Sequence, residues 1–241
     1  MRPAVQRAAD LLWPPRCPFC GEVLGPVCQC PACAPAVRAL ELTPHRLQPG
    51  EHRLDGLSGA AAVYRYEGAA REAILKLKNG QPYLARWLGA QMACRLYGCT
   101  FEEGYGKIKP SPPALAPCDV IVAVPPSRRD RGYQAPALLA RPLGRALGVP
   151  LAAGALRKAR PTQPQAGLGA AERLANLTGS VVVAQPGQVA GRRVLLVDDV
   201  ITTGATVSVC AAALLKAGAA EVFAVSVAAA LPFGQPLEQK E

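Results

Sequence analysis

Hydrophobic residues in this chain form short, fully apolar runs and longer stretches with helical spacing. The clearest run covers residues 194–197, where all side chains are apolar, as expected for a strand covered on both faces. A second buried strand is expected at 119–124. Strands and helices alternate through residues 119–230, and this order predicts an α/β fold with a parallel sheet covered on both faces.

The same patterns place the remaining elements. An edge strand is expected at 60–67 and a long amphipathic helix at 82–96. Pro142 is expected to kink or break a helix at 134–148, and 97–117 is expected to be a long Gly/Pro/Lys-rich loop. The other expected elements are strands at 150–156, 180–184 and 221–228, and helices at 69–78, 170–176 and 204–216.

Two acids and a small hydroxyl-rich turn follow the strand at 194–197. Asp198 and Asp199 come where this strand is expected to leave the sheet, just before the start of a helix. Free backbone N–H groups at a helix N-terminus bind anions, and carboxylates accept hydrogen bonds from vicinal hydroxyls. A ribose 5-phosphate carries both an anionic phosphate and vicinal hydroxyls. The candidate phosphate-binding residues are Val200, Ile201, Thr202, Thr203, Gly204, Ala205 and Thr206.

Two other interpretations of this turn are weaker. A nucleoside triphosphatase P-loop requires a lysine directly after its last glycine, and none follows Gly204. A core strand followed by a capped helix explains the threonines. It does not explain two adjacent acids at the end of a buried strand.

Basic residues follow two other expected strands. Ser127, Arg128 and Arg131 come after the strand at 119–124, and arginine forks match phosphate oxygens. Arg157 and Lys158 open a polar loop rich in proline and glutamine. Ligands bind beyond the carboxyl ends of parallel strands, so both segments are expected to meet the turn after Asp199. A solvated basic loop is the alternative for the first segment.

Two lysines close the expected helix at 69–78. Lys76 and Lys78 are placed to reach an anion. Basic residues in a last helical turn also complement the helix dipole, so a purely structural role is equally open.

Five of the nine cysteines fall near the N-terminus, in two Cys-x2-Cys pairs and one surplus thiol. Four thiolates in tetrahedral geometry are what zinc prefers, and so short a segment needs metal to fold. Cys28 is an alternative to Cys30, and a thioredoxin-like redox role is the main rival. The expected structural zinc ligands are Cys17, Cys20, Cys30 and Cys33.

The chain divides into three expected parts: a cysteine module at 1–35, a linker at 36–59 and an α/β domain at 60–236. The linker contains several prolines and little periodicity, so it is expected to wrap the surface. His45 and His52 lie in it. Either one could be an extra metal ligand, but exposed loop histidines are the simpler interpretation.

Composition limits the partners and the compartment. The 241 residues carry a net charge of +10, from 27 basic and 17 acidic residues. This favours anionic partners such as phosphorylated metabolites or nucleic acid. The N-terminal residues lack a secretory pattern, and the apolar stretch at 222–231 is too short to span a bilayer. A cytoplasmic protein is expected, in which clustered cysteines indicate metal rather than disulfides.

The stretch at 197–206 resembles the phosphoribosyl-pyrophosphate (PRPP) motif of type I phosphoribosyltransferases. That pattern has apolar residues, two acids, a spacer and Thr-Thr-Gly-x-Thr. The resemblance implies that Asp198 and Asp199 hold the ribose hydroxyls and that the turn holds the 5-phosphate.

Five blocks of the sequence carry a wider resemblance. They are the cysteine pairs after a Pro-Pro lead-in, 63–68, 74–78, 124–127 with 131–133, and 164–168 with Glu172, Arg173 and Asn176. Through these blocks nearly the whole chain is similar to the ComF family. The resemblance implies a parallel-sheet type I phosphoribosyltransferase fold preceded by a small zinc module with four cysteine ligands. It also implies a role in natural competence, the uptake and handling of transforming single-stranded DNA beside a helicase partner.

An active transferase of this kind would displace pyrophosphate from the ribose anomeric carbon with a nitrogen nucleophile. Mg2+ and basic side chains would stabilise the leaving group. Whether a transfer occurs is left open, and three functions remain: a ComF-like competence protein, a metabolic phosphoribosyltransferase of nucleotide salvage or biosynthesis, and a non-catalytic module binding nucleic acid or a partner. The residues expected to meet pyrophosphate are Arg128, Arg131, Arg157 and Lys158.

Overall fold

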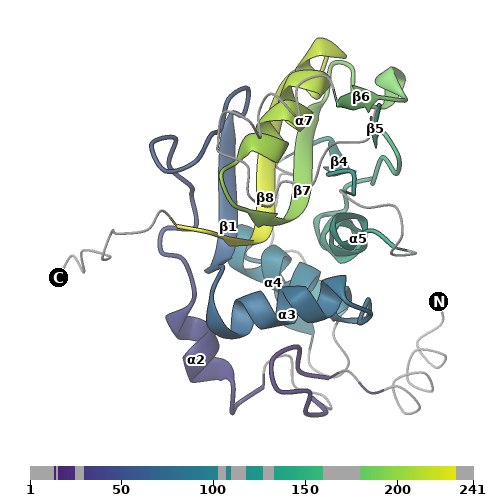
Figure 1. Ribbon diagram of the computed structural model, residues 1–241. Coiled ribbons are helices and arrows are strands. Elements are labelled where there is room, and N and C mark those ends of the chain that lie inside the picture. The colour runs from purple at the N-terminus through teal and green to yellow at the C-terminus, as the bar shows by residue number, and fades with distance from the viewer. Residues whose placement is uncertain are drawn as a thin grey trace.

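A computed structural model describes residues 14, 16–24, 30–102, 107–109, 118–126, 133–159 and 180–231. Its centre is a four-stranded sheet in the order β1-β8-β7-β4, with every neighbouring pair parallel (Figure 1). This confirms the predicted parallel α/β architecture. The strands are β1 (Gly59–Arg65), β8 (Glu221–Ala229), β7 (Arg193–Ile201) and β4 (Val120–Ala123).

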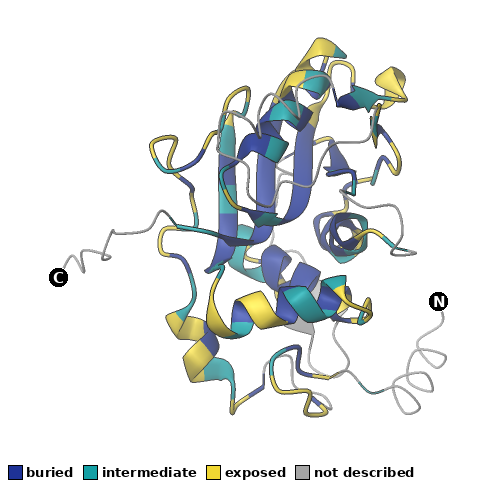
Figure 2. Cartoon of the chain, in the orientation of Figure 1, coloured by how far each residue is buried: buried dark blue, intermediate teal, exposed yellow. Residues whose placement is uncertain are grey.

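Helices cover both faces of this sheet, because alternate residues of each central strand point to opposite sides. In β7, Val194 and Leu196 belong to the hydrophobic cluster that includes the helix α7 (Ala205–Lys216). Leu195 and Val197 belong to the cluster on the other face, to which three longer helices contribute most of the helical residues. The inner strands β7 and β8 are therefore buried along most of their length, and the edge strand β1 is buried in part (Figure 2). The three helices are α3 (Gly68–Lys78), α4 (Leu84–Tyr97) and α5 (Ala135–Leu147).

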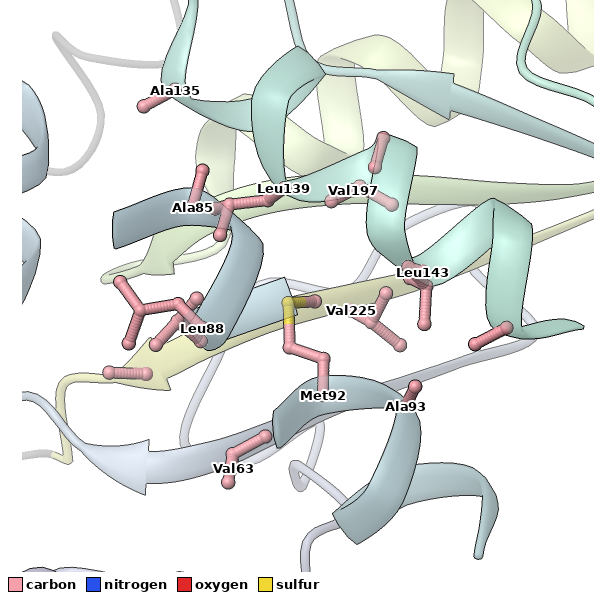
Figure 3. Packing of buried hydrophobic residues seen from close by; sticks show 14 of the residues in the cluster. Val63, Ala85, Leu88, Met92, Ala93, Ala135, Leu139, Leu143, Val197 and Val225 are labelled. Atoms are coloured by element: carbon pink, nitrogen blue, oxygen red, sulfur yellow. The ribbon is translucent and has the colours of Figure 1, made fainter. Parts of the chain in front are cut away.

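The helices α4 and α5 cross at very close range. A Cβ added at Gly89 would lie 2.4 Å from Pro142 Cγ and 2.6 Å from Leu139 O, so only glycine fits there. The helix α5 continues through Pro142 without the expected break. Figure 3 shows the core beneath this crossing, where Met92 and Leu143 lie among side chains of the sheet.

Strand β7 is longer than the sequence predicted. Asp198 and Asp199 lie inside it rather than beyond its end, because β8 continues alongside and pairs Asp198 with Ser226 and Ile201 with Ala229. Backbone pairing does not depend on side-chain polarity, so the acids do not end the strand.

Two further expectations about strands were wrong. The 97–117 stretch holds a small antiparallel pair, β2 (Thr100–Glu102) and β3 (Lys107–Lys109). No continuous strand runs over 150–156. Instead, Leu151 makes one bridge to Ile121, and β5 (Leu156–Lys158) pairs antiparallel with β6 (Val181–Val183), apart from the main sheet. The helix expected at 170–176 lies outside the described residues.

The segment predicted as a surface linker covers an edge of the sheet. It begins with the end of α2 (Ala34–Ala39), and then Leu42 N donates to Val63 O and Leu47 N donates to Ala60 O, both at 2.9 Å. These contacts shield the outer edge of β1, which would otherwise offer unpaired backbone groups.

His52 differs from its prediction as an exposed residue. It is 2% exposed, and its Nε2 lies 2.9 Å from Ala230 O.

The short 3-10 helix η1 (Pro186–Gln188) precedes β7. Across the described ranges, no helix combines the length and the hydropathy needed to cross a bilayer.

Candidate functional site

A cavity of about 300 Å3 opens where β4 and β7 end. This is the edge at which parallel sheets bind ligands. Its charged side chains come from elements that are far apart in the sequence, α3, β5 and β7, and the start of α7 adds a threonine. The charged and threonine side chains that line the cavity are those of Lys78, Lys158, Asp198, Asp199, Thr202 and Thr206.

The two acids have different environments. Asp198 accepts a hydrogen bond from the backbone N–H of Asp199 at 2.8 Å. Burial raises the pKa of Asp198 to about 7, and the neighbouring Asp199 carboxylate contributes to this rise. Asp199 Oδ1 instead lies 2.6 Å from Lys78 Nζ. Burial thus favours the protonated form of Asp198, while Asp199 is held by an ammonium group.

The turn after β7 is supported from behind by the segment around Arg53. Gly204 has φ +80°, and a Cβ there would lie 2.0 Å from Arg53 O. Arg53 N donates to Thr203 O at 2.8 Å, and Ser208 Oγ donates to Arg53 O at 2.9 Å. The rear of the turn is therefore occupied by protein, whereas Thr202 and Thr206 line the cavity.

The start of α7 makes this turn suitable for an anion. The helix begins at Ala205, so its first N–H groups lie at the turn and lack helical partners. Ala205 N reaches Thr203 Oγ1 at a long 3.4 Å. Val200 also lines the cavity, whereas Ile201 is buried in the core.

The predicted basic residues are only partly brought together. Lys158 lines the cavity, and its partial burial lowers its pKa. Arg157, its neighbour in β5, is exposed and does not line the cavity, because adjacent strand residues point to opposite sides. Both lie in a strand rather than in the expected loop. Ser127, Arg128 and Arg131 lie outside the described residues.

Two aromatic residues of the cavity were missed by sequence reasoning as site residues. Tyr66 follows β1, and Tyr133 precedes α5. The Tyr133 hydroxyl donates to Leu77 O and accepts from Gly80 N at 2.9 Å. Its position in the Arg-Gly-Tyr block at 131–133 was the only signal available.

The N-terminal cysteines form a compact cluster. The Sγ atoms of Cys17, Cys20, Cys30 and Cys33 all lie within 4.8 Å of one another, and those of Cys20 and Cys30 are 3.7 Å apart. A tetrahedral zinc site with Zn–S bonds of about 2.3 Å requires S–S separations of about 3.8 Å. The cluster therefore fits a zinc ion and includes Cys30. Cys28 lies outside the described residues.

The cysteine cluster is packed against the helical layer. The Phe19 ring meets Trp87 of α4 edge-on, with centroids 5.3 Å apart and planes at 89°. Lys76 Nζ donates to Phe19 O at 3.0 Å. Phe19 and Cys33 also pack against the main core. The cluster is thus in direct contact with α3 and α4.

Comparison with known proteins agrees with this geometry. The phosphoribosyl transferase domain family matches residues 137–236, which include β7, the turn and α7. The DNA utilization protein YhgH of Escherichia coli (strain K12) is 40% identical over 107 residues, covering 43% of this chain and 46% of that protein. Competence protein F of Haemophilus influenzae is 38% identical over 93 residues, covering 38% and 41%.

These alignments span less than half of the length of the curated relatives. Among solved structures, the allosteric regulatory enzyme of purine biosynthesis is 24% identical, with a TM-score of 0.35 over 58% of this chain and 25% of that chain. The family match thus concerns residues 137–236, and together with the two relatives it confirms the predicted resemblance of the chain to the ComF family.

Proposed function

We propose that this chain binds PRPP with Mg2+ in the cavity at the end of β7 and acts in natural competence, in the handling of transforming single-stranded DNA. One observation carries the ligand proposal. Two buried acids directly precede a helix N-terminal turn, and both line one cavity with Lys78 and Lys158. The cavity volume lies at the lower end of the range of about 300–1,000 Å3 for small-molecule sites.

The parts of PRPP match separate parts of this cavity. The ribose hydroxyls donate to Asp198 and Asp199, and the 5-phosphate accepts from the amides and hydroxyls of the turn at 202–206. The pyrophosphate lies toward Lys158, with Arg128 and Arg131 as its further expected partners. Arg157 serves the same anion only if β5 rearranges, because its side chain faces away from the cavity.

The carboxylates also suit a hard cation. Mg2+ prefers oxygen ligands and is held by one or two carboxylates together with substrate phosphates. Asp198 and Asp199 provide that donor set. When bound, Mg2+ would neutralise the charge of the pyrophosphate group.

The role in DNA handling rests on other observations. Relatives named for DNA utilization and competence match the chain, and its net charge is +10. Basic surfaces attract the phosphates of single-stranded DNA. A competence helicase is the proposed protein partner. Whether the chain also catalyses a transfer reaction is tested by measuring pyrophosphate release from PRPP in the presence of candidate bases. Release with a free base but no effect of DNA would favour the metabolic alternative.

Calorimetric titration with PRPP and Mg2+ tests the ligand proposal. Ligand at about one hundred times its Kd stabilises a protein by about 2.7 kcal/mol, which corresponds to a rise in Tm of roughly 5–10 °C for a chain of this size. The double variant Asp198→Asn with Asp199→Asn is expected to lose binding and the shift.

The matched control removes the same charge elsewhere. Glu72 and Glu221 are exposed and lie outside the cavity lining, so Glu72→Gln with Glu221→Gln is expected to bind PRPP as the intact chain does. Absence of heat and of a Tm shift in the intact chain would refute PRPP binding.

A further inference from the structure

The last turn of α3 contacts three separate parts of the molecule. Lys76 Nζ donates to Phe19 O at 3.0 Å, inside the first Cys-x2-Cys pair. Leu77 O accepts from the Tyr133 hydroxyl. Lys78 Nζ lies 2.6 Å from Asp199 Oδ1 in the cavity. Three consecutive residues thus join the cysteine cluster, the segment before α5 and the candidate ligand site.

Helix geometry explains how adjacent residues reach such different places. Each helical residue is rotated by about 100° from the previous one, so Lys76 and Lys78 point in directions about 200° apart. Leu77, between them, is completely buried in the core. A displacement of this turn toward or away from the cysteine cluster therefore moves Lys78 relative to the cavity.

Lys78 is equipped to contact a ligand directly. Its ammonium group has three N–H donors, and the contact with Asp199 Oδ1 uses one of them. Lys78 lines the cavity together with Thr202 and Lys158, so its other two donors can meet a ligand bound there. An anionic sugar phosphate held by Asp199 and the turn would lie beside this ammonium group.

Lys76 is attached to a part of the chain whose geometry depends on the cysteines. Phe19 lies between Cys17 and Cys20, and its carbonyl direction is set by the turn that brings both sulfurs inward. The Phe19 ring is also held against Trp87. A change in the geometry of the cysteine cluster would therefore move Phe19 O and, through its hydrogen bond with Lys76, the last turn of α3.

We propose that Lys78 is a ligand-contacting residue of the PRPP site and that Lys76 positions it by anchoring the same helical turn to the cysteine cluster. This inference rests on the proposed function and extends it. The cysteine cluster thereby supports the affinity of a cavity with which it shares no lining residue among those described. A disturbed cluster loosens the turn, and Lys78 then spends less time in the cavity.

A double-mutant cycle on PRPP binding tests the proposal. Lys78→Met is expected to weaken PRPP binding by about tenfold or more, the usual effect of losing a charged hydrogen bond. Lys76→Met is expected to weaken it by a few-fold in the intact chain and to have no further effect in the Lys78→Met background. Lys76→Arg, which still donates to a carbonyl, is expected to restore binding.

The control is Lys216→Met. Lys216 also lies in the last turn of a helix, α7, but outside the cavity lining. Lys216→Met therefore removes the same charge, and the same favourable interaction with a helix dipole, as Lys76→Met and Lys78→Met do. PRPP binding is expected to be unchanged in this control. Equal effects of Lys76→Met in both backgrounds, or no effect in either, would overturn the positioning role. Unchanged binding in Lys78→Met would overturn the contact.

A second cycle separates this inference from the proposed function. The coupling between Lys78→Met and Asp199→Asn is measured by urea unfolding without ligand, in the intact chain and in Lys76→Met. The coupling is expected to shrink when Lys76 is replaced, and an unchanged coupling would refute the positioning role. If the intact chain bound no PRPP, the proposed function and the ligand contact would fail, while this cycle would still decide whether Lys76 positions Lys78.

Discussion

Replacement of Gly204 by alanine is expected to destabilise the protein and displace the phosphate-binding turn. Gly204 has φ +80°, a backbone conformation that costs an L-residue about 1–2 kcal/mol. The new Cβ would also lie 2.0 Å from Arg53 O, 2.9 Å from Arg53 C and 3.0 Å from Arg53 N. These are backbone atoms, so no side-chain rotation relieves the overlap.

The loss in the free energy of unfolding depends on which contacts the displaced turn gives up. Separating the turn from the Arg53 backbone weakens two hydrogen bonds, Arg53 N to Thr203 O at 2.8 Å and Ser208 Oγ to Arg53 O at 2.9 Å. Each contributes about 0.5–1.5 kcal/mol net. Together with the backbone strain, Gly204→Ala is expected to lower the free energy of unfolding by about 2–5 kcal/mol, summed from these ranges.

Urea unfolding measures this loss, and Gly154→Ala is the matched control. Gly154 has φ +75°, but a Cβ there would meet nothing within 4 Å. The control therefore carries the backbone strain alone, about 1–2 kcal/mol. The reasoning would be refuted if Gly204→Ala cost no more than Gly154→Ala. PRPP affinity is expected to fall only in Gly204→Ala.

Three further predictions concern the acids, the cysteines and DNA. Burial raises the pKa of Asp198 from 3.8 to about 7, so the folded chain binds the proton more tightly and stability should fall as pH rises from about 4 to about 7. Asp198→Asn should flatten this slope in urea unfolding, and an unchanged slope contradicts the assignment. Purified protein should contain one zinc per chain, lost in Cys20→Ser but kept in Cys94→Ser; metal analysis finding substoichiometric zinc in the intact chain argues against the cluster. Binding of a single-stranded oligonucleotide should weaken steeply between about 50 and 200 mM salt, and a flat response would remove direct DNA contact.

The sequence was most informative where structure and chemistry are local. The apolar run at 194–197, the two acids and the Thr-Thr-Gly turn are contiguous, so they predicted a strand, a turn and a helix start in the correct order. The spacing of the cysteine pairs likewise predicted four thiols, which the structure brings together. Local patterns of this kind depend on few assumptions about tertiary contacts.

Contacts between distant segments escaped prediction. His52 lies in a proline-rich stretch, and nothing near it indicates that Ala230 O would meet its Nε2. The pairing of β5 with β6 joins short strands on either side of residues 160–179, and the partner of a strand is not encoded in its own pattern. Lys78 was recognised as a basic residue near a helix end, but its partner Asp199 is set by the fold.

The strand order β1-β8-β7-β4 has a consequence for synthesis of the chain. Both outer strands are made before both inner ones, and they never touch each other in the finished sheet. A nascent chain that has reached residue 190 therefore holds two apolar strands whose sheet neighbours do not yet exist. Unpaired strand edges promote aggregation. We therefore expect the chain to aggregate more readily during synthesis, before β7 and β8 emerge and close the sheet between them, than after the sheet is complete.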